Sequence, residues 1–136
     1  QMNQLHIKRA ISPVSVADNT AQTGEVIDLQ GYDACTFVIA TGSIGDADAT
    51  FAVEVQECDT SGGSYTAVAD ANLIGTEALA GFIFSDDNKC FKVGYVGSKR
   101  YVKLVITPSG NASAALISAV AVLGHPNKSP TSNPPA

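Results

Sequence analysis

A strict alternation of apolar and polar residues in the middle of the chain constrains its fold more than any other feature. In residues 50–58, Phe51, Val53 and Val55 alternate with smaller or polar residues. Successive side chains of a β-strand point to opposite faces, so this period of two predicts a strand with one buried face. Residues 90–108 repeat the pattern and predict two strands paired as a hairpin through the turn Gly-Ser-Lys-Arg.

Further strand-like segments follow at regular intervals. They cover residues 26–30, 35–41, 64–69, 81–85 and 114–124. The second and the last of these are apolar enough to suggest burial of the whole strand, and a helical turn is conceivable only just before Gly75. About eight strands, joined by turns every 8 to 12 residues or so, are typical of sandwiches, jelly rolls and small barrels. We therefore expect an all-β, single-domain, jelly-roll-like antiparallel β-sandwich with extended N- and C-terminal arms.

The two ends differ from the middle of the chain. Residues 1–12 are largely polar, and residues 125–136 contain four of the six prolines. A proline-rich segment packs poorly into a core and stays extended, so each end is expected to be a free arm or a strap that orders on a neighbour. This divides the chain into an N-terminal arm (1–12), a sandwich domain (13–124) and a C-terminal tail (125–136). The residues expected to contact a partner are Leu5, Ile7, Lys8, Arg9, Ile11, His125 and Pro126.

The charges are few and unevenly placed. Charged residues make up 15% of the chain, and the net charge is −5, against about 25% charged in typical domains. A surface built from small residues tolerates being covered by another protein. All 13 acidic residues lie between Asp18 and Asp87, a stretch without Lys or Arg. Either the fold separates an acidic face from a basic one, or strands from the two segments interleave and their charges pair.

The cysteines and the apolar runs indicate the compartment. Cys35, Cys58 and Cys90 are odd in number and show no CxxC spacing, which argues against disulfides and against a zinc site. No apolar run approaches the ~18 to 20 residues of a membrane span, and residues 1–10 lack the apolar stretch of a signal peptide. We expect a soluble protein that is not exported and has no membrane partner.

Candidates for catalysis are scarce. The two histidines, His6 and His125, lie in the two ends, and no GxSxG, GxGxxG or Walker motif occurs. Asp46 with Asp48, and Asp86 with Asp87 and Asn88, could supply oxygen ligands to calcium from loops, but their role as solvated turn residues explains both clusters better. We expect no enzyme activity, no cofactor and no metal.

Nucleic-acid binding has one candidate segment. Residues 89–103 combine five basic residues with Phe91, Tyr95 and Tyr101, as single-strand-binding surfaces do. The pI of about 4.7 and the strand alternation, which sends some of these rings into the core, argue against it. Asn111 begins an Asn-Ala-Ser sequon, which has no meaning in a protein that is not exported.

Residues 15–126 resemble a known family, most distinctively in the segments GYVGSKRYVKL (94–104) and AVAVLGHP (119–126). The family consists of small capsid cement proteins encoded near the major capsid gene of tailed phages and prophages. The resemblance implies a jelly-roll protein of the virion, made in the host cytoplasm, that binds the major capsid protein on the outside of the head. It also implies that the protein clamps neighbouring capsomers, as a dimer. Two alternatives stay open: a head-completion or tail component, and a carbohydrate-binding module, since jelly rolls often serve as lectins.

Overall fold

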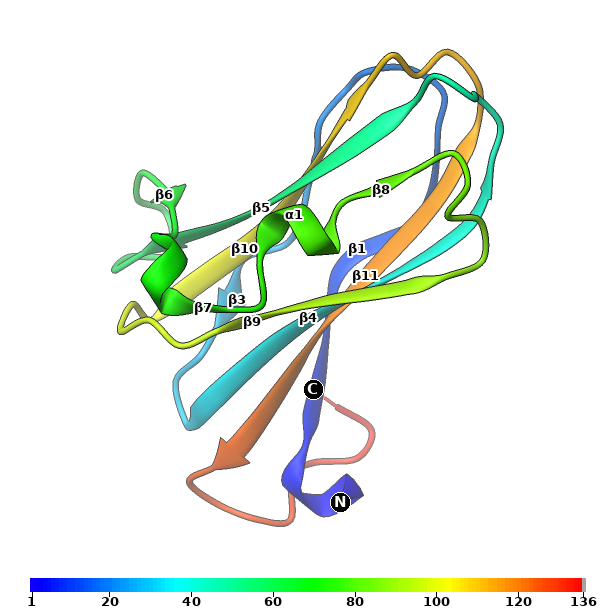
Figure 1. The fold of residues 1–136 in the computed structure, drawn as a ribbon. Helices are drawn as coiled ribbons and strands as arrows, with labels where there is room; N and C mark the ends of the chain where they lie inside the picture. The colour runs from blue at the N-terminus through cyan, green and yellow to red at the C-terminus, as the bar shows by residue number, and fades with distance from the viewer. Residues whose placement is uncertain (136) are drawn as a thin grey trace.

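Two antiparallel β-sheets pack face to face in the computed structural model, which describes residues 1–135 (Figure 1). The first sheet has the strand order β1-β11-β4-β9-β7, and the second has β2-β10-β5-β6, with β3 paired to β10 and β8 paired to β5. The strands of the first sheet are β1 (His6–Val16), β11 (Ala115–Pro126), β4 (Tyr32–Ile44), β9 (Cys90–Tyr95) and β7 (Leu73–Ile74). Those of the second are β2 (Gln22–Thr23), β3 (Ile27–Asp28), β10 (Tyr101–Ser109), β5 (Thr50–Cys58), β6 (Thr66–Ala67) and β8 (Phe82–Ile83).

The order of the strands is that of a jelly roll. The first long strand, β1, pairs with the last, β11, and β4 lies between β11 and β9. The strands that follow β1, β4 and β9 along the chain (β2, β5 and β10) lie in the opposite sheet, so the chain crosses repeatedly from one sheet to the other. This winding confirms the expected jelly-roll-like antiparallel sandwich.

The core lies between the two sheets and follows the predicted alternation. Val102, Leu104 and Ile106 of β10 are fully buried, and so are Phe37 and Ile39 of β4. Phe51, Val53 and Val55 of β5 also point inward. Full burial of one such side chain contributes roughly 1.5–3 kcal/mol, so the facing strands β4, β5, β10 and β11 hold most of the apolar stabilisation.

The predicted hairpin of residues 90–108 is wrong. β9 belongs to the first sheet and β10 to the second, so the segment between them is an arch across the sandwich. The Tyr95 hydroxyl holds this arch: it donates to Glu57 Oε2 (2.6 Å) and accepts the Lys99 N–H (3.0 Å). Alternation shows which face of each strand is buried. It does not distinguish pairing within one sheet from packing across two, because both arrangements bury the same residues.

Residues 35–41 and 114–124 are buried on one face only, contrary to expectation. Phe37 and Ile39 point into the core, whereas Val38 and Ala40 lie on the opposite face of β4. In β11, the residues that alternate with the core positions remain exposed or half-buried. Apolar side chains on an outward face made these strands look wholly buried in the sequence.

The N-terminal arm is shorter than expected. β1 begins at His6, so residues 6–12 are part of the first sheet, with His6 opposite Leu123. A register shift between Arg9 and Ile11 turns Ala10 and Ile11 both into the core. This shift breaks the alternation, and the strand therefore did not stand out in the sequence.

The C-terminal tail folds back on its own chain. β11 continues to Pro126, and the backbone N–H of Thr131 donates to the carbonyl of Asn3 (3.0 Å) in the short 3-10 helix η1 (Met2–Gln4). The Thr131 hydroxyl also donates to the Leu5 carbonyl. β1, β4 and β11 extend past the second sheet to a narrow end, where both termini lie (Figure 1).

Two short helical segments close one side of the sandwich. The 3-10 helix η2 (Asp70–Asn72) precedes Gly75, and α1 (Glu77–Ala80) follows it. Thr76 caps α1 by accepting the Leu79 N–H, and Glu77 Oε2 accepts the Val55 N–H of β5 (2.6 Å). Within residues 1–135, no helix is long and apolar enough to span a membrane.

Candidate interaction surface

The outward side of the first sheet is unusually apolar for an exposed surface. We call this surface the outer face. Its members are the side chains that alternate with core positions on the five strands: Ile7, Arg9, Thr36, Val38, Ala40, Ile74, Cys90, Lys92, Gly94, Leu116, Ser118, Val120 and Val122. The exposed fraction is 64% for Ile74, 45% for Leu116, 39% for Ile7 and 37% for Val120. A contiguous exposed apolar patch on a globular protein marks an interaction site more often than single exposed residues do.

Glycines allow two of these side chains to lie across neighbouring strands. A Cβ at Gly42 would come within 2.8 Å of the Leu116 Cβ, and a Cβ at Gly94 would come within 3.2 Å of the Ile74 Cβ. Leu116 therefore covers Gly42 on β4, and Ile74 lies against Gly94 on β9. Small residues such as Ala40 and Ser118 lie between them. No aromatic side chain is a member of the outer face.

Two shallow hollows open on the outer face. One, of about 320 Å³, is lined by Val14, Ala40, Gly42 and Leu116 among others. The second, also of about 320 Å³, lies by β7 and β9. Its lining residues are Asp33, Ala34, Cys35, Thr36, Ile74, Gly75, Lys92, Gly94, Tyr95 and Val96. Both hollows have room for side chains of a covering protein.

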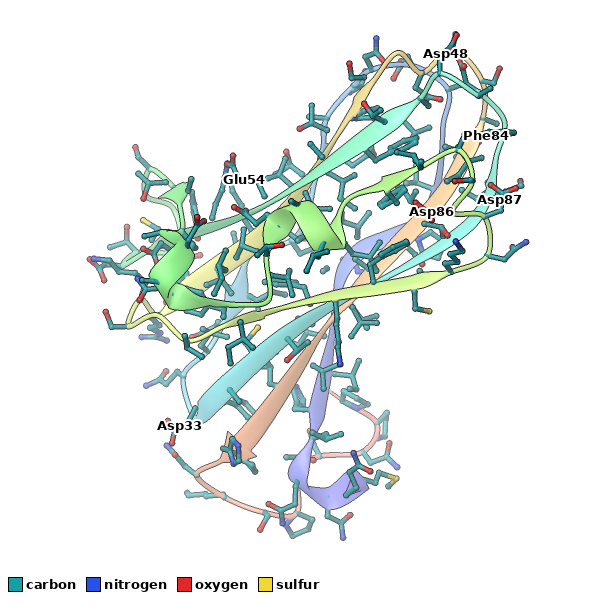
Figure 2. The ribbon with its side chains drawn as sticks, in the orientation of Figure 1. Asp33, Asp48, Glu54, Phe84, Asp86 and Asp87 are labelled. Carbon is teal, nitrogen blue, oxygen red and sulfur yellow. The ribbon has the colours of Figure 1, made fainter. Side chains whose placement is uncertain are left out.

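The outward side of the second sheet has a different chemistry. Glu54, Gln56 and Lys103 lie on it, and Lys103 Nζ sits 4.3 Å from the centre of the Tyr65 ring. Glu54 is seen on β5 in Figure 2. The outward side of β5 and β10, the polar face, is therefore more polar than the outer face, whereas exposed Leu79, Ile83 and Phe84 lie on α1 and by β8, beside β5.

The structure brings two of the seven predicted contact residues together. Ile7 and Arg9 lie on the outer face, while Lys8 points to the other side of β1. Ile11 is only 7% exposed and belongs to the core, because the register shift after Arg9 turns it inward, so its expected contact role is corrected.

The remaining predicted residues lie at the narrow end. Leu5 is half-buried beneath Thr131 of the tail. His125 is exposed with a positive φ of 48°, and Pro126 pairs with Tyr32. The prediction missed Leu116, Val120, Ile74 and Lys92. The sequence did contain a signal for this face: Val, Ala and Leu occupy both the odd and the even positions of residues 114–124. A strand with one solvent-exposed face needs apolar residues only on its buried side.

The acidic and basic segments interleave. Four ion pairs occur among residues 1–135, and three of them join the acidic middle of the chain to basic residues far away in sequence. These are Arg9–Glu25 (3.4 Å), Lys99–Asp59 (2.8 Å) and Arg100–Asp28 (2.9 Å); the fourth, Lys89–Asp86 (3.0 Å), is local. The second interpretation of the charge pattern, cross-strand pairing, thus holds for these residues.

The same pairing disperses the basic segment considered for nucleic-acid binding. Lys89, Lys99 and Arg100 have carboxylate partners. Lys92 lies on the outer face, and Lys103 lies on the other sheet. Tyr95 is buried in the core.

The loop carboxylates serve as turn caps. Asp46 accepts the N–H groups of Asp48 (2.9 Å) and Ala112 (2.8 Å), and these bonds hold the pKa of Asp46 below its usual value. The pKa of Asp86 is lowered by the Ile83 N–H and by Lys89. Asp48, Asp86 and Asp87 gather at the end of the sandwich remote from Asp33 (Figure 2). Within residues 1–135, no three His, Cys, Asp or Glu side chains are grouped so as to hold a metal ion.

The remaining candidates for chemistry occupy separate and mostly buried places. His6 is 5% exposed and stacks on Tyr32, with 5.5 Å between ring centres. Asn111 of the sequon is buried, and its Nδ2 donates to the carbonyls of Val16 (3.0 Å) and Asp18 (3.1 Å). Cys35 is also buried, which raises the pKa of its thiol to about 12.

Comparison with known proteins locates the fold but not a family. No protein-family model and no curated protein matches the chain. Among solved structures, the PBSX exported protein XepA is similar over 87% of this chain and 36% of its own length, with 11% identity and a TM-score of 0.59. A chain of infectious bursal disease virus, strain Gx, is similar over 90% of this chain and 32% of its own, with 12% identity and a TM-score of 0.51. The SPBc2 prophage-derived protein YomS has 13% identity over 85% of this chain and 94% of its own, with a TM-score of 0.43. This chain thus spans about a third of the length of XepA and of the viral chain, and at these identities the likeness is one of fold.

Proposed function

We propose that this chain is a structural protein of a tailed-phage virion, namely a cement protein on the outside of the head. In this role it binds the major capsid protein and stabilises the contacts between capsomers. The sequence resemblance of residues 15–126 to capsid cement proteins supports the proposal, and so does the shared fold with a PBSX protein and with a viral chain. The homodimer that the resemblance implies is part of the same proposal.

The observation that carries the proposal is the outer face. A cement protein acts by covering surface on subunits that are already assembled. This requires a broad, exposed surface that binds protein. The outer face has exposed Ile7, Ile74, Leu116 and Val120 on a sheet without projecting rings. Burial of apolar surface contributes about 25 cal/mol for each Å² removed from water, so a protein that covers this face gains binding free energy from each of them.

The energetics of a shell suit many weak clamps. A protein that binds only the assembled shell stabilises it by mass action, with a free energy that grows with the free concentration and the affinity. When one molecule contacts two capsomers, the second contact forms at a high effective concentration. Modest affinity at each copy therefore adds up to a substantial stabilisation of the whole head.

Deleting the gene for this chain from its phage tests the function. We expect heads that assemble without the chain but lose DNA at a lower temperature than wild-type heads, with stability restored when purified protein is added. Quantitative gel analysis of wild-type heads should show the chain in a ratio to the major capsid protein that matches the capsomer contacts. Absence of the chain from purified heads would overturn the proposal. A ratio of this chain to the major capsid protein that corresponds to a single vertex of the head would indicate a head-completion or tail component instead.

A further inference from the structure

One transverse row of the outer face has a cation at each end and two valines between them. Arg9 lies opposite Val120, Val120 lies opposite Val38, and Val38 lies opposite Lys92. The row crosses four neighbouring strands, and strands in a sheet lie about 4.8 Å apart, so the backbones at Arg9 and Lys92 are separated by about 14 Å.

The two cations are available to a partner. Lys92 takes part in none of the ion pairs among residues 1–135, and its neighbours on the face are small: Ala40, Cys90 and Gly94. Arg9 donates to the Ser12 hydroxyl (2.6 Å) and contacts Glu25 at 3.4 Å, with the Arg9 and Glu25 side chains 62% and 59% exposed. An exposed pair at that distance is weak and readily exchanged for another carboxylate.

The charges also indicate which occupant the outer face fits. The row itself carries no carboxylate, although Glu25 pairs with Arg9 beside it and Asp33 lines the hollow that Lys92 also lines. Two copies stacked row on row would therefore bring four cations together over buried valines. Like charges opposed in an interface cost binding free energy, and this disfavours a second copy of the chain in that arrangement. A partner with carboxylates at the edges of an apolar patch would complement both features.

We infer that the outer face docks on a shell-protein surface that is apolar at its centre and carries carboxylates on both sides, about 14 Å apart, that pair with Lys92 and Arg9. This inference rests on the proposed function, since it takes the shell protein as the occupant. It adds the side of the sandwich that faces the shell and the chemistry of the surface that receives it.

Zero-length crosslinking on decorated heads tests the contact. Heads from the gene-deletion phage are decorated with purified protein and treated with a carbodiimide, which joins an amine directly to a carboxylate within ion-pair distance. Mass spectrometry should find Lys92 joined to an Asp or Glu of the major capsid protein, and Lys103 of the opposite sheet should give no such product. A Lys92 crosslink to a carboxylate of a second copy of this chain would overturn the inference.

Charge variants give an independent readout on the same heads. Lys92→Glu should bind about tenfold or more weakly than wild type, and Lys92→Met, which keeps the length of the side chain, should lose part of the affinity and part of its dependence on salt. The control Lys103→Glu makes the same change of net charge on the polar face, where we expect an affinity within about twofold of wild type. Circular dichroism melts of all three variants check that each one folds.

The outcomes separate this inference from the proposed function. If wild type binds heads and Lys92→Glu binds equally well, the docking inference is wrong while the cement function stands. If Lys103→Glu is the variant that loses binding, the polar face is the shell-facing side, and the inference is likewise wrong. If wild type does not bind heads at all, the proposed function fails and the inference fails with it.

Discussion

At the scale of single residues, the crossing between the two sheets depends on Tyr95. Its ring is buried, its hydroxyl bonds both Glu57 and the Lys99 backbone, and a Cβ at Gly97 would clash with that hydroxyl. The arch of residues 96–100 is therefore built around one phenol, and Gly97 permits the close approach. Burial and the hydrogen bond from Tyr95 to Glu57 raise the pKa of this phenol well above its usual value.

We predict that Tyr95→Phe lowers the free energy of unfolding by about 1–3 kcal/mol. The change removes the donor to Glu57 and the acceptor for Lys99, while the ring keeps its place in the core. Urea denaturation at pH 7 measures the effect. The control is Tyr65→Phe, which loses one exposed hydrogen bond to the Ser61 carbonyl and should cost clearly less. Equal losses for the two variants would contradict the role given to Tyr95.

At the scale of elements, Asn111 ties the loop before β11 to the end of β1. Its side chain donates to the carbonyls of Val16 and Asp18, and its backbone N–H donates to Asn19 Oδ1 (2.8 Å). The first and last long strands are thus fastened at the end of the sandwich where β1 stops and β11 begins.

We predict that Asn111→Ala destabilises the protein by about 1–3 kcal/mol, because the two carbonyls lose a buried donor. Thermal melts compare it with Asn127→Ala, an exposed asparagine that should leave the melting temperature nearly unchanged. Hydrogen exchange should also become faster at the start of β11. A variant as stable as wild type would show that water replaces the amide without loss.

We expect the C-terminal tail to contribute little to the stability of the fold. Beyond Pro126, its hydrogen bonds to the rest of the chain include those of Thr131 to Asn3 and Leu5. We predict that removal of residues 127–136 leaves a single cooperative unfolding transition with only a small drop in the denaturation midpoint. Loss of cooperativity would mean that the tail belongs to the core. Removal from His125 onward would also cut the end of β11, so it is the less clean experiment.

Sequence patterns predicted the fold well at the level of strands and poorly at the level of pairing. The alternation in β5 and β10 identified the buried faces because a half-buried strand must sort its residues by side. The same alternation could not assign β9 and β10 to different sheets, and the register shift after Arg9 concealed β1. The outer face was missed because Val120 and Leu116 look like core residues until the strand order shows that they lie on the side of the first sheet that faces away from the second.

At the scale of the whole molecule, carboxylates determine how stability depends on pH. Hydrogen bonds or ion pairs lower the pKa of Asp18, Asp28, Asp46 and Asp86 from the ordinary value of 3.8. For Asp28, the main cause is the side-chain hydrogen bond from Arg100. Since these pKa values are lower in the folded state, the unfolded state takes up protons first as the pH falls.

We predict that the urea midpoint stays nearly constant from pH 7 to about pH 5 and falls as the pH drops through about 4 and below. The stabilisation from these carboxylates is complete at pH values above their pKa in the unfolded state. It is lost as the pH falls through their lower pKa in the folded state. Asp28→Asn should lower the midpoint at pH 7 and reduce its further loss in acid. A midpoint that rises on acidification would contradict the lowered pKa values of these aspartates. Glu77 acts in the opposite sense, because its pKa is raised, mainly by burial.

The molecule as a whole is a two-sided plate, with an apolar outer face on the first sheet and the polar face of β5 and β10 on the second. We predict that the outer face is the side that binds the shell. A cryo-electron microscopy reconstruction of the phage head at side-chain resolution tests this directly. We expect density for this sandwich on the outside of the shell, with β1, β11, β4 and β9 against the major capsid protein and β10 and β5 toward solvent. A sandwich bound through β10 and β5, with Val120 and Leu116 exposed to solvent, would contradict it.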